Sequence, residues 1–192
     1  MALPVINSSP QYELVIPSTG QKVEFRPYLV KEEKVLMVAF ESGDQKQATK
    51  AIGNTLNACI TTDDVDVFEL TTYDIEYLFT QIRTKSVGET SRVVIPCTSC
   101  EHKNDVEINL ETVQIENAEN STETINITDD ILIELSYPSY RRILDQESTG
   151  TGEDGLVFAE TCVKAILPEE ERFDVAEVGD GKLRELLENL NT

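Results

Sequence analysis

The stretch from Thr71 to Leu110 constrains the fold more than any other, because it opens with a helix whose start, buried face and end are all specified. Four apolar residues recur at helical spacing and predict one buried stripe. They are Ile75, Leu78, Phe79 and Ile82. Thr71 and Asp74 form a capping-box-like pair at the start. Gly88 can adopt the left-handed conformation that ends many helices, so we expect a core helix over residues 71–88.

Two β-like runs follow this helix and flank a pair of cysteines. The runs are Arg92–Pro96 and Asp105–Leu110, and Cys97 and Cys100 lie between them. In the second run, apolar residues alternate with polar ones, which is typical of a half-buried strand. The spacing therefore predicts a β-hairpin that carries a Cys-x-x-Cys motif.

Strands and helices both recur along the rest of the chain. A loose N-terminal arm over residues 1–10 precedes two runs, Tyr12–Ile16 and Lys22–Phe25, that predict a hairpin. Further strands are predicted at Val113–Ile115, Glu123–Ile127 and Ile131–Tyr137. Helices are predicted from Val30 to about Gly43 and over Asp44–Ile60, Ser139–Glu147, Leu156–Leu167 and Lys182–Leu190.

These elements predict an α+β fold, with helices packed on a largely antiparallel sheet. At 192 residues the chain is long enough for one sizeable core, and we expect a single domain over residues 1–192. Within it, residues 101–134 form an acidic, β-rich subregion, with ten acidic residues and one basic residue, Lys103. The Gly-rich residues 148–155 are expected to form a flexible loop.

The formal net charge of −20 limits the kinds of partner. An acidic surface repels phosphate backbones and anionic lipids, so neither nucleic acid nor a membrane is an expected partner. No apolar run reaches the ~20 residues that span a bilayer. The N-terminus lacks the features of a signal peptide. We therefore expect the protein in the cytoplasm, with its four cysteines reduced.

Cys97 and Cys100 are the only residues with metal-like spacing, and they make structural zinc the one candidate cofactor. Two thiolates on a hairpin turn form half of a tetrahedral zinc site, which takes four ligands. His102 is so close to Cys100 that a shared metal would be strained. Cys59 and Cys162 lie in predicted apolar helices, where a free cysteine acts as a small hydrophobe. A structural zinc, a metal-free knuckle and a redox role all stay open.

No catalytic constellation is found in the sequence. His102 is the only histidine, and its charged neighbours predict a solvated turn rather than a general base. Neither GxxxxGK[ST] nor GxGxxG occurs, so nucleotide binding has no support. The sequence therefore predicts a protein that is not an enzyme.

Several blocks of the sequence resemble a known family. The most specific is IEYLFTQIRTKSVGE, residues 75–89, followed by the cysteine hairpin. Further blocks are VEFRPYLVKEEKVLM at residues 23–37, the helix that ends in Cys59 and the helix that holds Cys162. Together they resemble the T4-type phage baseplate protein family, that of the baseplate hub subunit encoded by gene 26 in T4-like myoviruses.

The resemblance implies a non-enzymatic role in the hub of a contractile tail baseplate, as a structural subunit or as a chaperone-like assembly factor. The partners it implies are other baseplate and tail hub proteins, met in the host cytoplasm during assembly and in the virion. Association into a homo-oligomer stays an open alternative. A second hypothesis, which rests on the cysteine hairpin alone, is a zinc-ribbon-like module that recruits a polymerase or nucleic acid.

Overall fold

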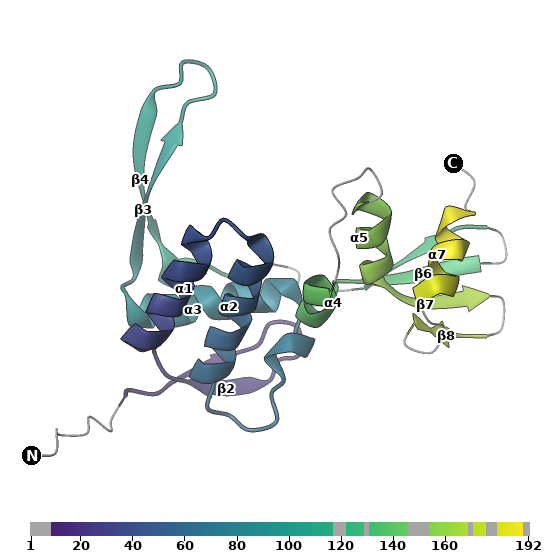
Figure 1. Cartoon of the computed structure of the whole chain (residues 1–192), viewed down its shortest axis with the longest axis horizontal. Coiled ribbons are helices and arrows are strands. Elements are labelled where there is room, and N and C mark those ends of the chain that lie inside the picture. The colour runs from purple at the N-terminus through teal and green to yellow at the C-terminus, as the bar shows by residue number, and fades with distance from the viewer. Residues whose placement is uncertain are drawn as a thin grey trace, which may run out of the picture. The chain divides into compact units, whose positions relative to one another are not determined.

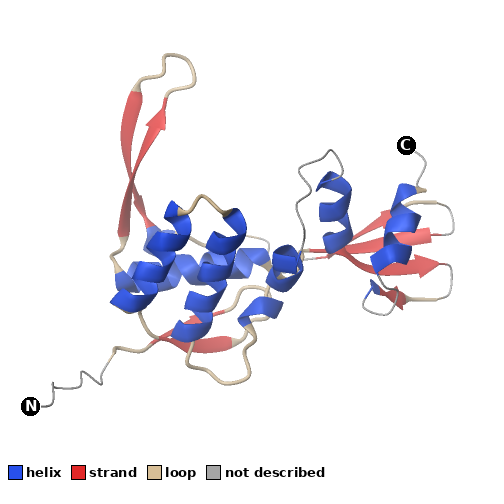
Figure 2. Cartoon of the chain, in the orientation of Figure 1, coloured by secondary structure: helices blue, strands red, loops and turns tan. Residues whose placement is uncertain are grey.

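The computed structural model describes residues 9–116, 122–128, 131–145, 154–168, 171–175 and 180–189. The described chain forms helices and antiparallel sheets, which confirms the predicted α+β class (Figures 1 and 2). It divides into two compact units, one of Met1–Val67 and Tyr73–Glu116 and the other of Phe68–Thr72 and Asn117–Thr192. None of the described helices is both long and apolar enough to cross a membrane.

The first unit combines a hairpin with three helices. Strands β1 (Tyr12–Val15) and β2 (Lys22–Phe25) pair antiparallel, which confirms the predicted hairpin. The helices are α1 (Val30–Glu41), α2 (Gln45–Cys59) and α3 (Thr72–Ser86). The core of this unit is made of apolar side chains from β2, the three helices and the residue after β1; its fully buried members include Ile16, Val23, Leu56, Ile75, Leu78 and Ile82.

The helix α3 lies close to the predicted bounds, and a distant contact fixes its start. Asp74 is fully buried, and its Oδ1 accepts a hydrogen bond from the backbone N–H of Ser18 at 2.9 Å. Gly88 follows the helix with a φ of +142°, a conformation that favours glycine. Local sequence thus ends the helix, and tertiary contact with the β1–β2 turn holds its beginning.

A long two-stranded ribbon follows α3. Strands β3 (Thr90–Pro96) and β4 (Lys103–Asn109) pair antiparallel over their whole length, from Thr90↔Asn109 to Pro96↔Lys103. In Figure 1 the ribbon projects away from helices α1, α2 and α3. Residues 97–102 form the turn at its tip, and a short 3-10 helix, η2 (Leu110–Thr112), follows β4.

The second unit is built on a four-stranded antiparallel sheet in the order β5–β6–β7–β8. Its strands are β5 (Thr122–Asn126), β6 (Ile131–Ser136), β7 (Val163–Pro168) and β8 (Phe173–Asp174). Its helices are α4 (Tyr140–Asp145), α5 (Asp154–Cys162) and α7 (Asp180–Glu188). Ile133, Val163, Val175 and Leu183 form its core.

A short segment from the first half of the chain belongs to this second unit. The 3-10 helix η1 (Val67–Glu69) leads into it, and residues 68–72 pack on the start of α4. Leu70 accepts a hydrogen bond from the backbone N–H of Tyr140 at 2.8 Å. The guanidinium of Arg141 pairs with the carboxylate of Glu69. Residues 68–72 are therefore held by residues that come much later in the chain.

Two predicted elements are wrong in the second half of the chain. Leu156–Leu167 is not one helix: α5 ends at Cys162 and β7 follows, because pairing with β6 buries Val163 and Ala165 on alternate positions. The predicted strand Val113–Ile115 pairs with no described strand, since η2 turns the chain just before it.

Other boundaries differ in smaller ways. Residues 101–134 contribute β4 to the ribbon and β5 and β6 to the four-stranded sheet. Most of the predicted arm over residues 1–10 and of the predicted loop over 148–155 lies outside the described residues. Asp154 and Gly155, assigned to that loop, are instead the first residues of α5.

Candidate interaction surfaces and the cysteine turn

The apolar stripe of α3 points into the first unit. Ile75, Leu78 and Ile82 are at most 1% exposed. Phe79 is partly buried and packs against a cluster of Leu36, Ala39 and Ala51, which lie on α1 and α2. The stripe therefore contributes core to this unit, and any surface for a partner lies elsewhere on it.

A buried ion pair sets the position of α1. Arg26 follows β2 and donates two hydrogen bonds to the carboxylate of Glu32, at 2.9 and 3.1 Å, and a third to the carbonyl of Ala58 at 2.8 Å. The backbone N–H of Leu29 also donates to Glu32, at 2.5 Å. Burial acts to raise the pKa of Glu32, but the hydrogen bonds from Arg26 and Leu29 outweigh it and lower that pKa.

Apolar side chains of α1 are also exposed on either side of its buried stripe. At 3.6 residues per turn, Val35 and Val38 lie on one flank of Leu36 and Ala39, and Phe40 lies on the other. Val35, Val38 and Phe40 are 55, 60 and 50% exposed, while Leu36 and Ala39 are buried. None of the described residues fully covers Val35 and Val38, which makes their face a candidate contact surface.

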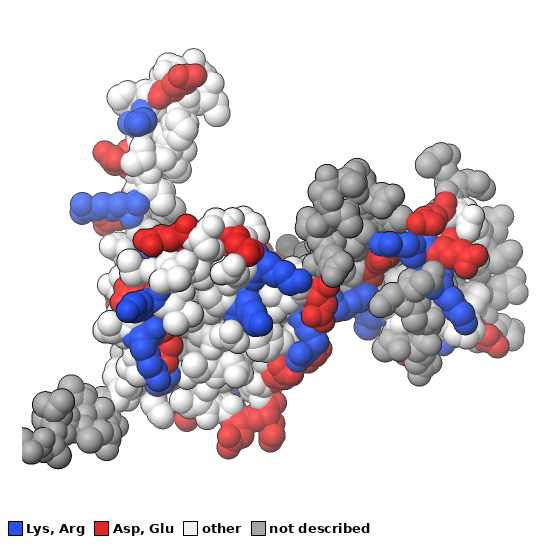
Figure 3. Space-filling model, viewed as in Figure 1, with Lys and Arg blue, Asp and Glu red and all other residues white. Residues whose placement is uncertain are grey.

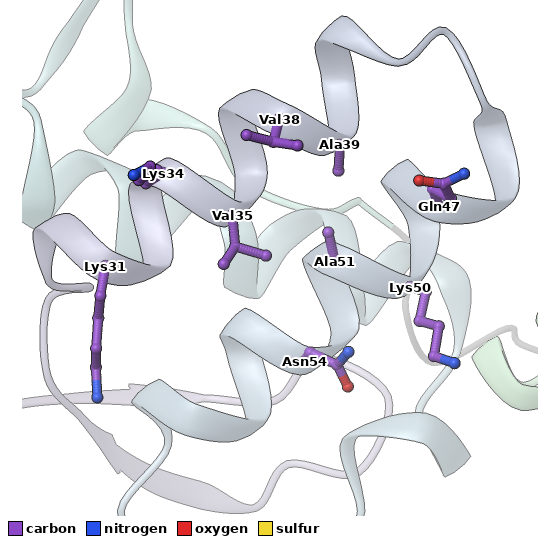
Figure 4. A pocket seen from close by; sticks show the side chains of 9 residues that line it. All are labelled: Lys31, Lys34, Val35, Val38, Ala39, Gln47, Lys50, Ala51 and Asn54. Carbon is purple, nitrogen blue, oxygen red and sulfur yellow. The ribbon is translucent and has the colours of Figure 1, made fainter.

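This exposed face borders a groove between α1 and α2, with a volume of about 420 Å³ (Figure 4). Val35, Val38, Ala39 and Ala51 form its apolar lining. In Figure 4, Ala39 of α1 and Ala51 of α2 point toward one another, and these small side chains leave room between the helices. Lys31, Lys34 and Lys50 also line the groove.

The charge of the groove is opposite to that of the whole protein. α2 contains Lys46 and Lys50 but no Asp or Glu, although the chain has a formal net charge of −20. In Figure 3, Lys and Arg side chains lie over α1 and α2 beside uncharged surface, with some Asp and Glu side chains among them. Lys34 and Lys50 form no ion pair with any described residue. The groove therefore offers positive charge around an apolar centre, as an acidic amphipathic partner would require.

Sequence reasoning predicted α1 and α2 but missed this groove. Two signals could have revealed it. One is the lack of acidic residues in Gln45–Cys59 within a strongly acidic chain. The other is that α1 carries more apolar residues than one buried stripe can use; they are Val30, Val35, Leu36, Met37, Val38, Ala39 and Phe40.

The second candidate surface is the β3–β4 ribbon, whose two faces differ. Residues opposite each other in an antiparallel pair share a face. Val93 pairs with Val106, and the pairs on either side of them place Ile95 and Ile108 on the same face. The other face carries the ion pair between Arg92 and Glu107, at 3.1 Å. The apolar face stays largely open, with Ile95 50% exposed.

The turn at the tip of this ribbon brings Cys97 and Cys100 together. The backbone N–H of Cys97 donates to the carbonyl of His102 at 2.8 Å, and that of Glu101 donates to the carbonyl of Cys97 at 2.9 Å. Hydrogen bonds from the backbone N–H of Ser99, and from the backbone and thiol of Cys100, lower the pKa of the Cys97 thiol. The turn therefore favours a thiolate, the form that binds metals.

The other two cysteines lie in different surroundings. Cys59 is fully buried, and its burial raises the pKa of its thiol to about 11 despite the neighbouring Arg26. Cys162 is half-buried at the end of α5. Within the described part of the chain, no three His, Cys, Asp or Glu side chains are grouped to hold a metal ion. The described residues thus provide two thiols at the tip rather than the four ligands of a zinc ribbon.

One comparison with known proteins shows the family of this chain. The family model described as "T4 bacteriophage base plate protein" matches residues 9–192. The chain belongs to this family. It is therefore a structural protein of the phage baseplate, as the resemblance of residues 75–89 implied. Neither the search of curated proteins nor that of solved structures gave a match.

Membership of this family favours the baseplate role over the zinc-ribbon-like alternative. The family implies contacts with other phage baseplate proteins. The groove of α1 and α2 and the open face of the ribbon are the surfaces of the first unit on which such contacts can be sought.

Proposed function

We propose that this protein is a non-catalytic component or chaperone-like assembly factor of the baseplate hub, and that it acts through protein–protein contacts. The observation that carries this proposal is the α1–α2 groove, with its apolar lining and its lysines. We further propose that the groove binds an amphipathic helix of another hub protein, with acidic residues beside its apolar stripe.

The chemistry of the groove supports this choice of partner. A helix laid into a groove contacts it through residues at i, i+3, i+4 and i+7, and Val35 and Val38 offer such anchors a surface. Acidic residues on the flanks of that helix would face Lys31, Lys34 and Lys50. A second copy of this chain fits less well, because two proteins of net charge −20 repel each other.

The test is binding to the purified hub proteins of the same phage, measured by co-sedimentation and calorimetry. Lys50→Glu reverses one charge in the groove, and we expect it to weaken binding by at least about tenfold, or ~1.4 kcal/mol. The matched control is Lys46→Glu, because Lys46 lies on the same helix but does not line the groove. We expect Lys46→Glu to keep the affinity within about twofold.

Two results would count against the proposal. Equal loss of binding in both variants would show that net charge matters and that the groove does not. Binding unchanged in both Lys50→Glu and Val38→Glu would move the contact surface away from α1 and α2. Affinity should also fall as salt rises, because the Debye length shortens from ~10 Å at 0.1 M to ~3 Å at 1 M.

A further inference from the structure

The tip of the β3–β4 ribbon has chemistry that the baseplate role does not use. The strands are seven residues long, so at ~3.4 Å per residue the ribbon reaches about 24 Å. At its end lie two free thiols, with Cys100 exposed and Cys97 half-buried. An extended ribbon with two thiols at its tip can bring those thiols to another molecule.

Two thiols are half of what a zinc ion binds. Zinc in structural sites is tetrahedral with four ligands, and Cys-x-x-Cys on a turn supplies two of them. We propose that the ribbon tips of two copies of this chain bind one zinc ion between them, with Cys97 and Cys100 of each copy as the four ligands. The site is thus complete only in the dimer.

The remaining nitrogen and sulfur ligands of the same chain are not placed to complete the site. Cys59 is buried in the core of the first unit, next to Arg26. Cys162 is half-buried at the end of α5 and could add at most one ligand, which would still leave the site one short of four. His102 is in the turn itself, yet it forms no three-ligand group with the two cysteines in the described structure. A second copy supplies what one copy lacks.

The turn also offers suitable outer contacts. The backbone N–H groups of Ser99 and Cys100 that hydrogen-bond to Cys97 would also stabilise a metal-bound thiolate, and such outer-shell bonds orient metal ligands. Each cysteine loses its proton when it binds the metal. Four thiolates and one Zn²⁺ leave a net charge of −2 at the site.

The length of the ribbon removes the main objection to a dimer, which is charge. Two chains of net charge −20 repel each other, but the Debye length at physiological salt is only ~8 Å. If the tips meet end to end, each ribbon holds the helices of its own unit about 24 Å away from the metal, by the rise per residue used above. Repulsion between the helices of the two first units is then strongly screened.

The experiment is native mass spectrometry of the full chain, reduced and titrated with zinc chloride. We expect a dimer with one zinc ion per two chains, which EDTA returns to monomer. Cys97→Ser and Cys100→Ser should each abolish the zinc-bound dimer and weaken zinc binding at least about 100-fold. Circular dichroism of both variants should show an unchanged fold, because the tip is outside the core.

Two control variants separate this site from its alternatives. Cys162→Ser and His102→Gln should both keep one zinc per dimer. Zinc bound by a monomer, zinc lost in His102→Gln, a zinc-bound dimer retained in Cys97→Ser, or no zinc bound by the wild-type chain would each overturn the proposal.

Discussion

Helix α3 and the β3–β4 ribbon are neighbours in the chain, and both carry a regular apolar pattern, yet only the helix is buried. Leu78 on α3 is fully buried, whereas Ile95 on the ribbon is half exposed. A two-stranded ribbon has no second layer to cover its apolar face, and an isolated hairpin is marginally stable in water. The same kind of pattern thus builds a core in one element and leaves an open surface in the next.

The difference teaches that periodicity shows which face of an element is apolar, but not what covers it. A pattern of period 3.6 or 2 reports local geometry, whereas burial depends on what packs against the element. The helix α1 makes the same point within a single element, because Leu36 is buried and Val38 is open.

The largest difference between the two regions should appear when an apolar side chain is shortened. Leu78→Ala should lower the free energy of unfolding by about 3 kcal/mol, since it leaves a cavity in a closed core. Ile95→Ala on the ribbon should lower it by less than about 1 kcal/mol, because half of that side chain already contacts water. Urea unfolding measures both, and equal losses would erase the distinction between core and surface.

The buried pair that positions α1 should give the next largest effect. Glu32→Gln leaves Arg26 without its carboxylate and should cost about 2 kcal/mol at pH 7, below the ~3–5 kcal/mol of a fully buried pair because Arg26 is partly exposed. Thermal unfolding of the variant and the wild type, compared at several pH values, provides the measurement.

The sign of the pH dependence follows from the lowered pKa of Glu32. A carboxyl whose pKa is lower in the folded state stabilises the fold above its unfolded pKa of about 4.3. That stability disappears as the pH falls through the lower, folded pKa. The gap between wild type and Glu32→Gln should therefore narrow in acid; a gap that widens there would contradict the assignment.

The cysteines extend the comparison to chemical reactivity. Cys59 is buried with a pKa raised to about 11, so at pH 8 it should react with a thiol reagent only as the protein opens. Cys97 and Cys100 should react within the mixing time in metal-free protein.

The same cysteines should also differ in their effect on stability. Cys59→Ser should lower the free energy of unfolding by about 1 kcal/mol, and Cys97→Ser should lower it by less than about 0.5 kcal/mol without zinc. Titration with a thiol reagent measures the reactivity of each cysteine, and thermal unfolding of each serine variant measures the change in stability.

The smallest effect on stability is expected at the open face of α1. Val38→Ser should change the free energy of unfolding by no more than about 0.5 kcal/mol, because the side chain is 60% exposed. The same variant should weaken binding of the proposed amphipathic partner helix. A large loss of stability would show that this valine is core and not contact surface.

Much of the first unit could be predicted from the sequence, since its elements are locally specified. The apolar stripe, the charged residues at the two ends and the glycine of residues 71–88 predicted α3. Two β-like runs separated by a turn predicted the β1–β2 hairpin. The bond from Ser18 to Asp74 spans 56 positions and leaves no local signal. Strand β7 was missed for a related reason: VKAIL extends the apolar pattern of α5, and only β6, more than twenty residues earlier, makes it a strand.

The candidate sites were predicted unevenly. The Cys-x-x-Cys spacing pointed to the turn directly, because two ligands close in sequence need no distant partner. The α1–α2 groove was missed, since it arises where Ala39 and Ala51 from different helices face each other. Small residues at a helix crossing leave no signature in either helix alone.

The position of residues 68–72 in the fold affects how the chain behaves during synthesis and when it is truncated. The partners of this segment are separated from it by long stretches of chain; Glu69 and Arg141 are 72 positions apart. During synthesis, residues 68–72 leave the ribosome well before α4 exists, so this segment lacks its α4 partners until the later part of the chain is made. A fragment ending at residue 116 would carry this segment without its binding site, and would expose Phe68, whose ring lies beside Tyr140 in the whole protein.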